Sequence, residues 1–98
     1  MGFVMDKLIE IHRQRIIELA KSRGAQRVQV FGSMAKDSAT PASDVDFLVE
    51  MRSGSTAFAL GGLLMDLQDL LGRRVDLVTP NALHPAIRDK VLKEAVDL

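Results

Sequence analysis

The sequence predicts an α/β or α+β domain, in which a few short strands are layered against helices. Three observations lead to this prediction. Apolar residues recur at helical spacing in three segments, short apolar runs typical of strands separate those segments, and glycine or proline follows most of them. A composition of 47% hydrophobic and 27% charged residues is typical of a folded globular protein. A chain of 98 residues has room for one core, so we expect one domain over residues 1–98.

The first half of the chain predicts a helix, two strands and the connection between them. Gly24 is expected to cap the helix at its C-terminal end, and Gly32 with Ser33 ends the first strand. Pro41 marks the connection as a loop. The predicted elements are a helix over 6–23, a strand over 27–31, a short helical turn over 34–37, a loop over 38–43 and a strand over 44–51.

The second half predicts a helix, a third strand and a last helix. These elements are expected over residues 60–71, 75–79 and 85–96, with Gly72 closing the first of them and Pro80 ending the strand. The helix over 60–71 is long enough for a crossover. The second and third strands are therefore predicted to be parallel neighbours.

The faces of the two later helices follow from the same spacing. Phe58 and Met65 fall off the leucine stripe of the helix over 60–71, which leaves them available for a protein interface. In the last helix, apolar residues that step by four are expected to face the core, and basic residues are expected on the solvated face. The apolar set is Leu83, Ile87, Val91 and Ala95, and the basic set is Arg88, Lys90 and Lys93.

Composition also excludes several kinds of function. The chain has no cysteine, so it forms no disulfide framework and no thiolate metal site, and His12 and His84 are too far apart in sequence to suggest a zinc cluster. Thirteen basic and thirteen acidic residues cancel, which leaves no general basic footprint for a long nucleic acid. No stretch resembles a membrane span or a signal peptide, so we expect a cytoplasmic protein.

Three acidic residues stand where strands are predicted. Residues two apart on a strand lie on one face, about 6.6 Å apart, so Asp44 and Asp46 point the same way. Asp76 lies inside the apolar third strand, where a charge is expected only if it faces a polar site. Neighbouring strands would let the three carboxylates converge. Such like charges repel unless they are protonated or bound to cations, and Mg²⁺ or Mn²⁺ suits these oxygen ligands.

A Gly-Ser pair directly follows the first strand. Gly32 allows the backbone to approach a ligand closely, and Ser33 can donate N–H and hydroxyl hydrogen bonds to phosphate oxygens. Two divalent ions about 3.5–4 Å apart on the carboxylates would complete a site for in-line phosphoryl or nucleotidyl transfer.

Each of these residues also has a purely structural interpretation. Asp44 can serve as a cap, Asp46 can be a solvated strand residue, and the Gly-Ser pair can be an ordinary turn. Asp76 can pair with Arg73 or Arg74 in an exposed edge strand. The presence of all these features in one chain favours the catalytic interpretation.

The order of these motifs, from Gly32-Ser33 through Asp44-x-Asp46 to Asp76, resembles the polymerase-β-like nucleotidyltransferases. Within that superfamily the chain looks like the minimal nucleotidyltransferases, the antitoxin partners of HEPN-domain toxins. Each motif alone is common, but their order, spacing and placement on strands are together specific. The resemblance covers nearly the whole chain and implies a small mixed sheet flanked by helices.

The resemblance also implies an activity. A minimal nucleotidyltransferase would transfer AMP from ATP to a tyrosine hydroxyl on a cognate HEPN toxin and release pyrophosphate. This modification would silence the toxin's RNase activity. By position, Asp44 and Asp46 would bind the metals that bridge to the triphosphate. Asp76 would ligate the catalytic metal and help to activate the acceptor hydroxyl, while Gly32 and Ser33 would hold the phosphates. Exposed edge strands are compatible with a homodimer or a complex with the toxin.

Two positions depart from the family pattern. Many relatives carry a basic residue two places after the glycine and another glycine near the end of that turn, where this chain has Met34 and Asp37. Lys36 is the nearest remaining cation and is predicted to contact the nucleotide, with a solvated surface lysine as the alternative. These departures motivate a rival hypothesis, a non-catalytic module that masks its toxin. Transfer to a small molecule such as an aminoglycoside is disfavoured, because the usual extra domain is absent.

Overall fold

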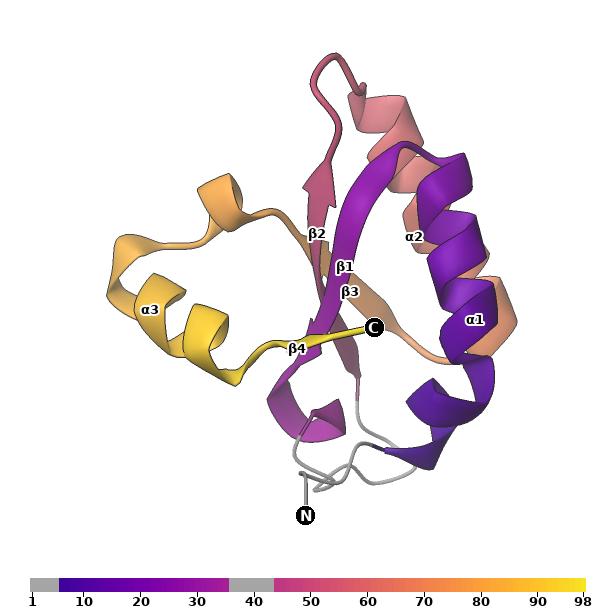
Figure 1. The fold of residues 1–98 in the computed structure, drawn as a ribbon, viewed down its shortest axis with the longest axis horizontal. Coiled ribbons are helices and arrows are strands. Elements are labelled where there is room, and N and C mark those ends of the chain that lie inside the picture. Colours follow the sequence, from indigo (N-terminus) through magenta and orange to yellow (C-terminus); the bar gives the residue numbers. More distant parts are fainter. Residues whose placement is uncertain (1–5, 36–43) are drawn as a thin grey trace.

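A computed structural model describes residues 6–35 and 44–98, apart from the side chain of Ser33. Its centre is a four-stranded sheet in the order β3-β2-β1-β4 (Figure 1). In chain order the elements are α1 (Lys7–Ser22), β1 (Ala25–Phe31), a 3-10 turn (Gly32–Met34), β2 (Val45–Met51), α2 (Ala57–Leu71), β3 (Val75–Val78), a second 3-10 turn (Pro80–Ala82), α3 (Pro85–Glu94) and β4 (Val96–Asp97). The α/β class and the mixed sheet flanked by helices are confirmed.

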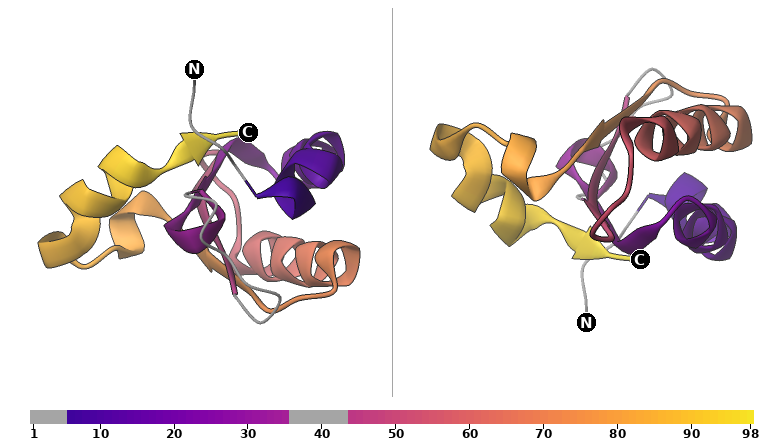
Figure 2. Two further views of the ribbon diagram at one scale, coloured as in Figure 1. Left: turned by 90° about the horizontal axis from the view of Figure 1, so that it is seen from below. Right: turned by 90° about the horizontal axis from the view of Figure 1, so that it is seen from above.

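The helices lie on both faces of the sheet. α1 and α2 lie side by side against one face, and α3 lies on the opposite side, as the views from below and above make clear (Figure 2). The main core fills the space under α1 and α2. A smaller cluster joins Leu48 of β2 to Leu83, which precedes α3, and to Val91 of α3. The sheet therefore has one thickly covered face and one face covered only in part.

Alternation along β2 explains which side chains face which layer. Val45, Phe47 and Val49 are fully buried and belong to the main core beneath α1 and α2. Asp46 and Leu48 point to the opposite face, because successive side chains of a strand alternate. An apolar set thus holds β2 in place while its acidic residue stays on the partly covered face.

The pairing of the strands confirms one prediction and sets the geometry of the site. β2 and β3 are parallel, as predicted from the crossover helix, and Asp46 is paired with Asp76 in their register. β1 is antiparallel to β2, with Phe31 opposite Asp46. The end of β1 and the beginnings of β2 and β3 therefore meet at one end of the sheet.

Two predicted elements differ from the structure. The last helix ends at Glu94, because Ala95 is extended (ψ 139°) and Val96 pairs with Val30 as β4 on the outer edge of β1. The β-branched side chain of Val96 packs against the main core in this position. The first helical turn already begins at Gly32 and covers Gly32–Met34, whereas a turn over 34–37 was predicted. Residues 36 and 37 of that prediction, and the predicted loop over 38–43, lie outside the described residues.

The two predicted helix caps have different outcomes. Gly72 caps α2 in the left-handed conformation (φ 63°), as expected. α1 is capped by Arg23, and Gly24, which has a φ of 91°, follows as the next residue. At its other end, α1 begins after Asp6, whose carboxylate accepts a hydrogen bond of 2.8 Å from the Leu8 N–H.

The predicted helix faces are correct in part. Phe58 and Met65 are exposed, as expected for residues off the leucine stripe. Ile87 is 49% exposed rather than buried, because the cluster under α3 is small. Arg88 is not simply solvated, since its guanidinium donates hydrogen bonds of 2.8 and 3.2 Å to the Pro80 carbonyl. No described helix has the length and apolar character needed to span a membrane.

Candidate active site

The register of the sheet brings two of the predicted carboxylates together. Asp46 and Asp76 are direct neighbours on β2 and β3, and each follows a residue that is buried in the main core, Val45 or Val75. Their side chains therefore both lie on the face of the sheet opposite the main core. The expected convergence of these two acidic residues is a direct result of the parallel pairing.

Gly32 closes the other side of Asp46. It directly follows the end of β1 and has a φ of 73°, a left-handed conformation that favours glycine. A Cβ atom at this position would lie 2.8 Å from Asp46 Oδ2, closer than real Cβ contacts allow. The missing side chain therefore gives the Asp46 carboxylate its space, and the sequence signal for this role is the Gly-Ser pair after a strand.

The carboxylates also interact electrostatically. Burial raises the pKa of Asp46, and the negative charges of Asp76 and then Asp44 raise it further, together with a hydrogen bond to Asp76. The Asp46 carboxyl is thus half-buried among like charges. Such a pair favours a shared proton or a bound cation over two free negative charges.

The carboxylates fit a divalent cation chemically, although they do not form a complete coordination site as they stand. Carboxylate oxygens are the ligands that Mg²⁺ prefers, and Asp46 and Asp76 lie side by side at one end of the sheet. In residues 6–35 and 44–98, however, no three acidic, histidine or cysteine side chains form a group that could hold a metal ion as they stand. Asp44 is exposed just before β2, so its side chain has room to turn toward the pair.

The other predicted nucleotide-binding positions are described to different extents. Ser33 follows Gly32 in the same 3-10 turn, and its side chain is outside the described part. Lys36 and Asp37 also lie outside the described residues. Met34 is fully buried in the main core, so its side chain supplies packing and no phosphate donor, in place of the basic residue that the family resemblance leads one to expect.

One residue beside the carboxylates was considered in the sequence only as a salt-bridge partner. Arg74 precedes β3, and its carbonyl accepts a hydrogen bond of 3.0 Å from the Val45 N–H. It is exposed and makes no ion pair within the described ranges. The signal that could have found it is its position two residues before Asp76, on the same face of a strand.

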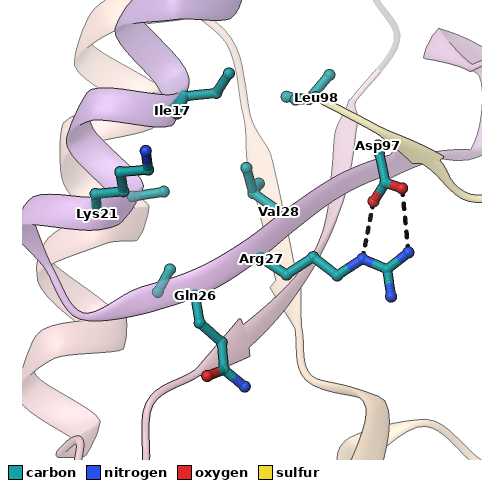
Figure 3. Close-up of a pocket in the computed structure, with 9 residues that line it drawn as sticks. Ile17, Lys21, Gln26, Arg27, Val28, Asp97 and Leu98 are labelled. Atoms are coloured by element: carbon teal, nitrogen blue, oxygen red, sulfur yellow. Dashed lines mark hydrogen bonds and ion pairs between the residues drawn. The ribbon is translucent and has the colours of Figure 1, made fainter.

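A surface pocket lies elsewhere on the molecule. It has a volume of about 450 Å³ between α1 and the outer edge of β1, where Ile17 and Lys21 face Val28 and Leu98 (Figure 3). On one wall, Arg27 donates hydrogen bonds of 2.8 and 3.1 Å to Asp97. None of the predicted catalytic residues lines this cavity. The acidic pair, rather than this cavity, is therefore the better candidate for chemistry.

The family model described as a nucleotidyltransferase domain matches residues 9–98. The chain belongs to this family. It is a nucleotidyltransferase enzyme, as its motifs predicted.

Relatives of this nucleotidyltransferase carry a more specific name. A protein of Thermococcus cleftensis named protein adenylyltransferase MntA is 34% identical over 92 residues, which cover 94% of this chain and 90% of that protein. A protein of Methanocaldococcus jannaschii named "putative protein adenylyltransferase" is 37% identical over 86 residues, which cover 88% and 92%. The nucleotidyltransferase is thus similar over most of its length to proteins named for protein adenylylation.

Solved structures show the same fold. One described as a "putative minimal nucleotidyltransferase" superposes with a TM-score of 0.85 at 40% identity, and covers 99% of this chain and 100% of that one. A structure described as an AMPylated HEPN toxin of Shewanella oneidensis in complex with its MNT antitoxin gives a TM-score of 0.67 at 21% identity, and covers 90% and 69%. The second likeness concerns the fold alone.

Proposed function

We propose that this nucleotidyltransferase transfers AMP from ATP to a tyrosine hydroxyl of a HEPN-type toxin and so acts as its antitoxin. The observation that carries the proposal is the Asp46–Asp76 pair, held in register beside Gly32. Relatives named protein adenylyltransferases support the reaction class. A similarly folded antitoxin in complex with an AMPylated HEPN toxin supports the partner and the acceptor protein.

The proposed reaction is one in-line displacement. The acceptor oxygen forms a bond to the α-phosphorus of ATP, and the bond from that phosphorus to the bridging oxygen of the β-phosphate breaks. Pyrophosphate leaves with the electron pair, and the hydroxyl proton passes to the Asp76 carboxylate. The N–H groups of the turn at Gly32 and Ser33 hold the phosphates of the leaving group.

The carboxylates have a second role in this proposal. Asp44, Asp46 and Asp76 would hold Mg²⁺ or Mn²⁺, which would neutralise phosphate charge when bound. The raised pKa of Asp46 supports this role, because its buried, like-charged surroundings favour a bound cation at neutral pH.

The intact mass of a HEPN-type toxin protein tests the proposal. After incubation with this nucleotidyltransferase, ATP and Mg²⁺, its mass should increase by one or more AMP units, and peptide mapping should locate them on tyrosine. Asp46→Asn should abolish the increase, because it removes a charge from the acidic pair. Glu50→Gln is the matched control, since Glu50 lies on the same strand but pairs with Arg27 at 3.5 Å, and this variant should retain transfer.

A rival mode of toxin neutralisation is favoured by one observation. The side chain of Met34 is fully buried and has no group that can donate to phosphate, which would weaken nucleotide binding. In the rival mode the chain masks its toxin without chemistry. Toxin inhibition that persists without ATP, and in variants lacking Asp44, Asp46 and Asp76, would support masking. Inhibition that requires both would support transfer.

A further inference from the structure

Arg74 stands beside the acidic pair on the face of the sheet where the chemistry is proposed. Extending the parallel register by one residue places it next to Asp44. Side chains alternate along this segment, and Val75 is buried in the main core. Arg74 and Asp76 therefore lie together on the opposite face.

The guanidinium of Arg74 is not committed to another part of the protein. Arg74 is exposed and forms no ion pair within residues 6–35 and 44–98. Other arginines do hold partners, since Arg23 binds Asp66 at 2.8 Å and Arg27 binds Asp97 at 2.8 Å. An exposed cation beside three carboxylates, yet paired with none of them, is available to a substrate.

The order of the strands indicates which of the two substrates, the nucleotide or the acceptor, lies near Arg74. Gly32 ends β1 on one side of Asp46, and Asp76 lies on β3 at the other side. Neighbouring strands are about 4.8 Å apart, so Arg74 lies roughly two strand spacings from the Gly-Ser turn. Attacking and leaving oxygens stand on opposite sides of phosphorus in an in-line transfer. If pyrophosphate leaves toward β1, the acceptor approaches from β3.

We propose that Arg74 binds the acceptor tyrosine, with its planar guanidinium against the aromatic ring and the hydroxyl directed to Asp76. This inference rests on the proposed transfer to tyrosine. Arginine suits the task because its guanidinium stacks on aromatic faces and keeps its charge at all physiological pH values. β3 is an edge strand and Arg74 directly precedes it, so a protein segment has access to this position.

Steady-state kinetics with a HEPN-type toxin protein as acceptor tests the role. Arg74→Ala should raise the KM for that protein by about 3–30-fold and leave the KM for ATP unchanged. Arg74→Lys should restore only part of the loss, since lysine keeps the charge without the planar group. Arg52→Ala is the control, because Arg52 is exposed, unpaired in the described residues and located after the opposite end of β2.

The ring contact is tested separately by competition. Toxin variants in which the acceptor tyrosine is replaced by phenylalanine or by alanine serve as inhibitors. Arg74→Ala should weaken inhibition by the phenylalanine variant and leave inhibition by the alanine variant unchanged. A KM for ATP that rises with the KM for the acceptor would assign Arg74 to the phosphates and overturn the inference. Unchanged kinetics would also overturn it. A wild-type chain that transfers nothing would remove the proposed function as well.

Discussion

Single residues determine the geometry of this site more than any cavity does. The carboxylate of Asp46 occupies space that exists only because Gly32 lacks a side chain, and the pKa of Asp46 is raised by burial and by Asp76 and Asp44. The Gly-Ser pair and the Asp-x-Asp spacing can be read in the sequence. Strand alternation then predicts which side chains share a face. The burial of Met34 and the location of Arg74 beside Asp44 could not, because both depend on the paired strands.

Gly32→Ala should destabilise the fold and abolish transfer. The left-handed φ of 73° alone costs roughly 1–2 kcal/mol for a residue with a Cβ, and the contact with Asp46 adds to that cost. Gly54→Ala separates the two effects, since Gly54 has a φ of 87° but would meet nothing within 4 Å. Thermal unfolding should show a larger loss for Gly32→Ala, and only that variant should lose activity. Equal losses of stability would argue against the contact.

Asp46→Asn should stabilise the metal-free protein while it abolishes transfer. The folded-state pKa of Asp46 is raised, so the protonated form is favoured by folding. That contribution is present below the unfolded pKa and is lost as pH rises through the raised value. At pH 7 without metal, removal of the like charge should therefore raise the Tm by a few °C, from about 0.2–1 kcal/mol. A lower Tm than wild type would show that Asp46 stabilises the metal-free fold.

Elements were predicted where one local signal dominates. Leucine spacing and Gly72 identify α2, and its length correctly predicted that β2 and β3 are parallel. β4 was missed because Ala95 continues the apolar spacing of α3 and the predicted helix therefore ran on to Val96, which becomes a strand residue only by pairing with the edge of β1. Short edge strands depend on tertiary pairing, so local patterns identify them poorly.

Two adjacent glycines in α2 give a matched test at this scale. Gly61→Ala should stabilise the protein by about 0.5–1 kcal/mol, because its Cβ would meet nothing and alanine favours helix. At Gly62 a Cβ would lie 2.6 Å from an Arg23 Nη atom, and would displace the guanidinium that binds Asp66. In chemical denaturation, the free energy of unfolding should therefore be higher for Gly61→Ala than for Gly62→Ala. The reverse order would mean that Arg23 moves away without loss.

At the scale of the whole molecule, long-range ion pairs join the outer elements. Arg23 links the end of α1 to α2, and Arg27 links β1 to β4, in both cases across more than 40 residues of sequence. Hydrogen bonds from these guanidinium groups lower the pKa values of Asp66 and Asp97. These pairs are exposed, so their contribution to the free energy of unfolding is small and sensitive to salt.

Protonation of Asp66 and Asp97 should consequently lower the free energy of unfolding in acid. A lowered folded-state pKa gives stability that is present above the unfolded value of about 3.9 and is lost as pH falls through the lowered value. Thermal unfolding between pH 5 and 2 should therefore be less steep in pH for a double Asp66→Asn and Asp97→Asn variant than for wild type. Identical pH profiles would show that other carboxylates determine acid unfolding.

The parallel pairing of β2 with β3 has a consequence for folding. Asp46 and Asp76 come from segments separated by the whole of α2, so they meet only after the chain has closed a long loop. A partly folded or still-emerging chain that lacks this pairing has no acidic pair with which to bind nucleotide. Under the proposed function, nucleotide is then a ligand of the complete fold alone, and its binding would shift the folding equilibrium toward the state that carries the acidic pair.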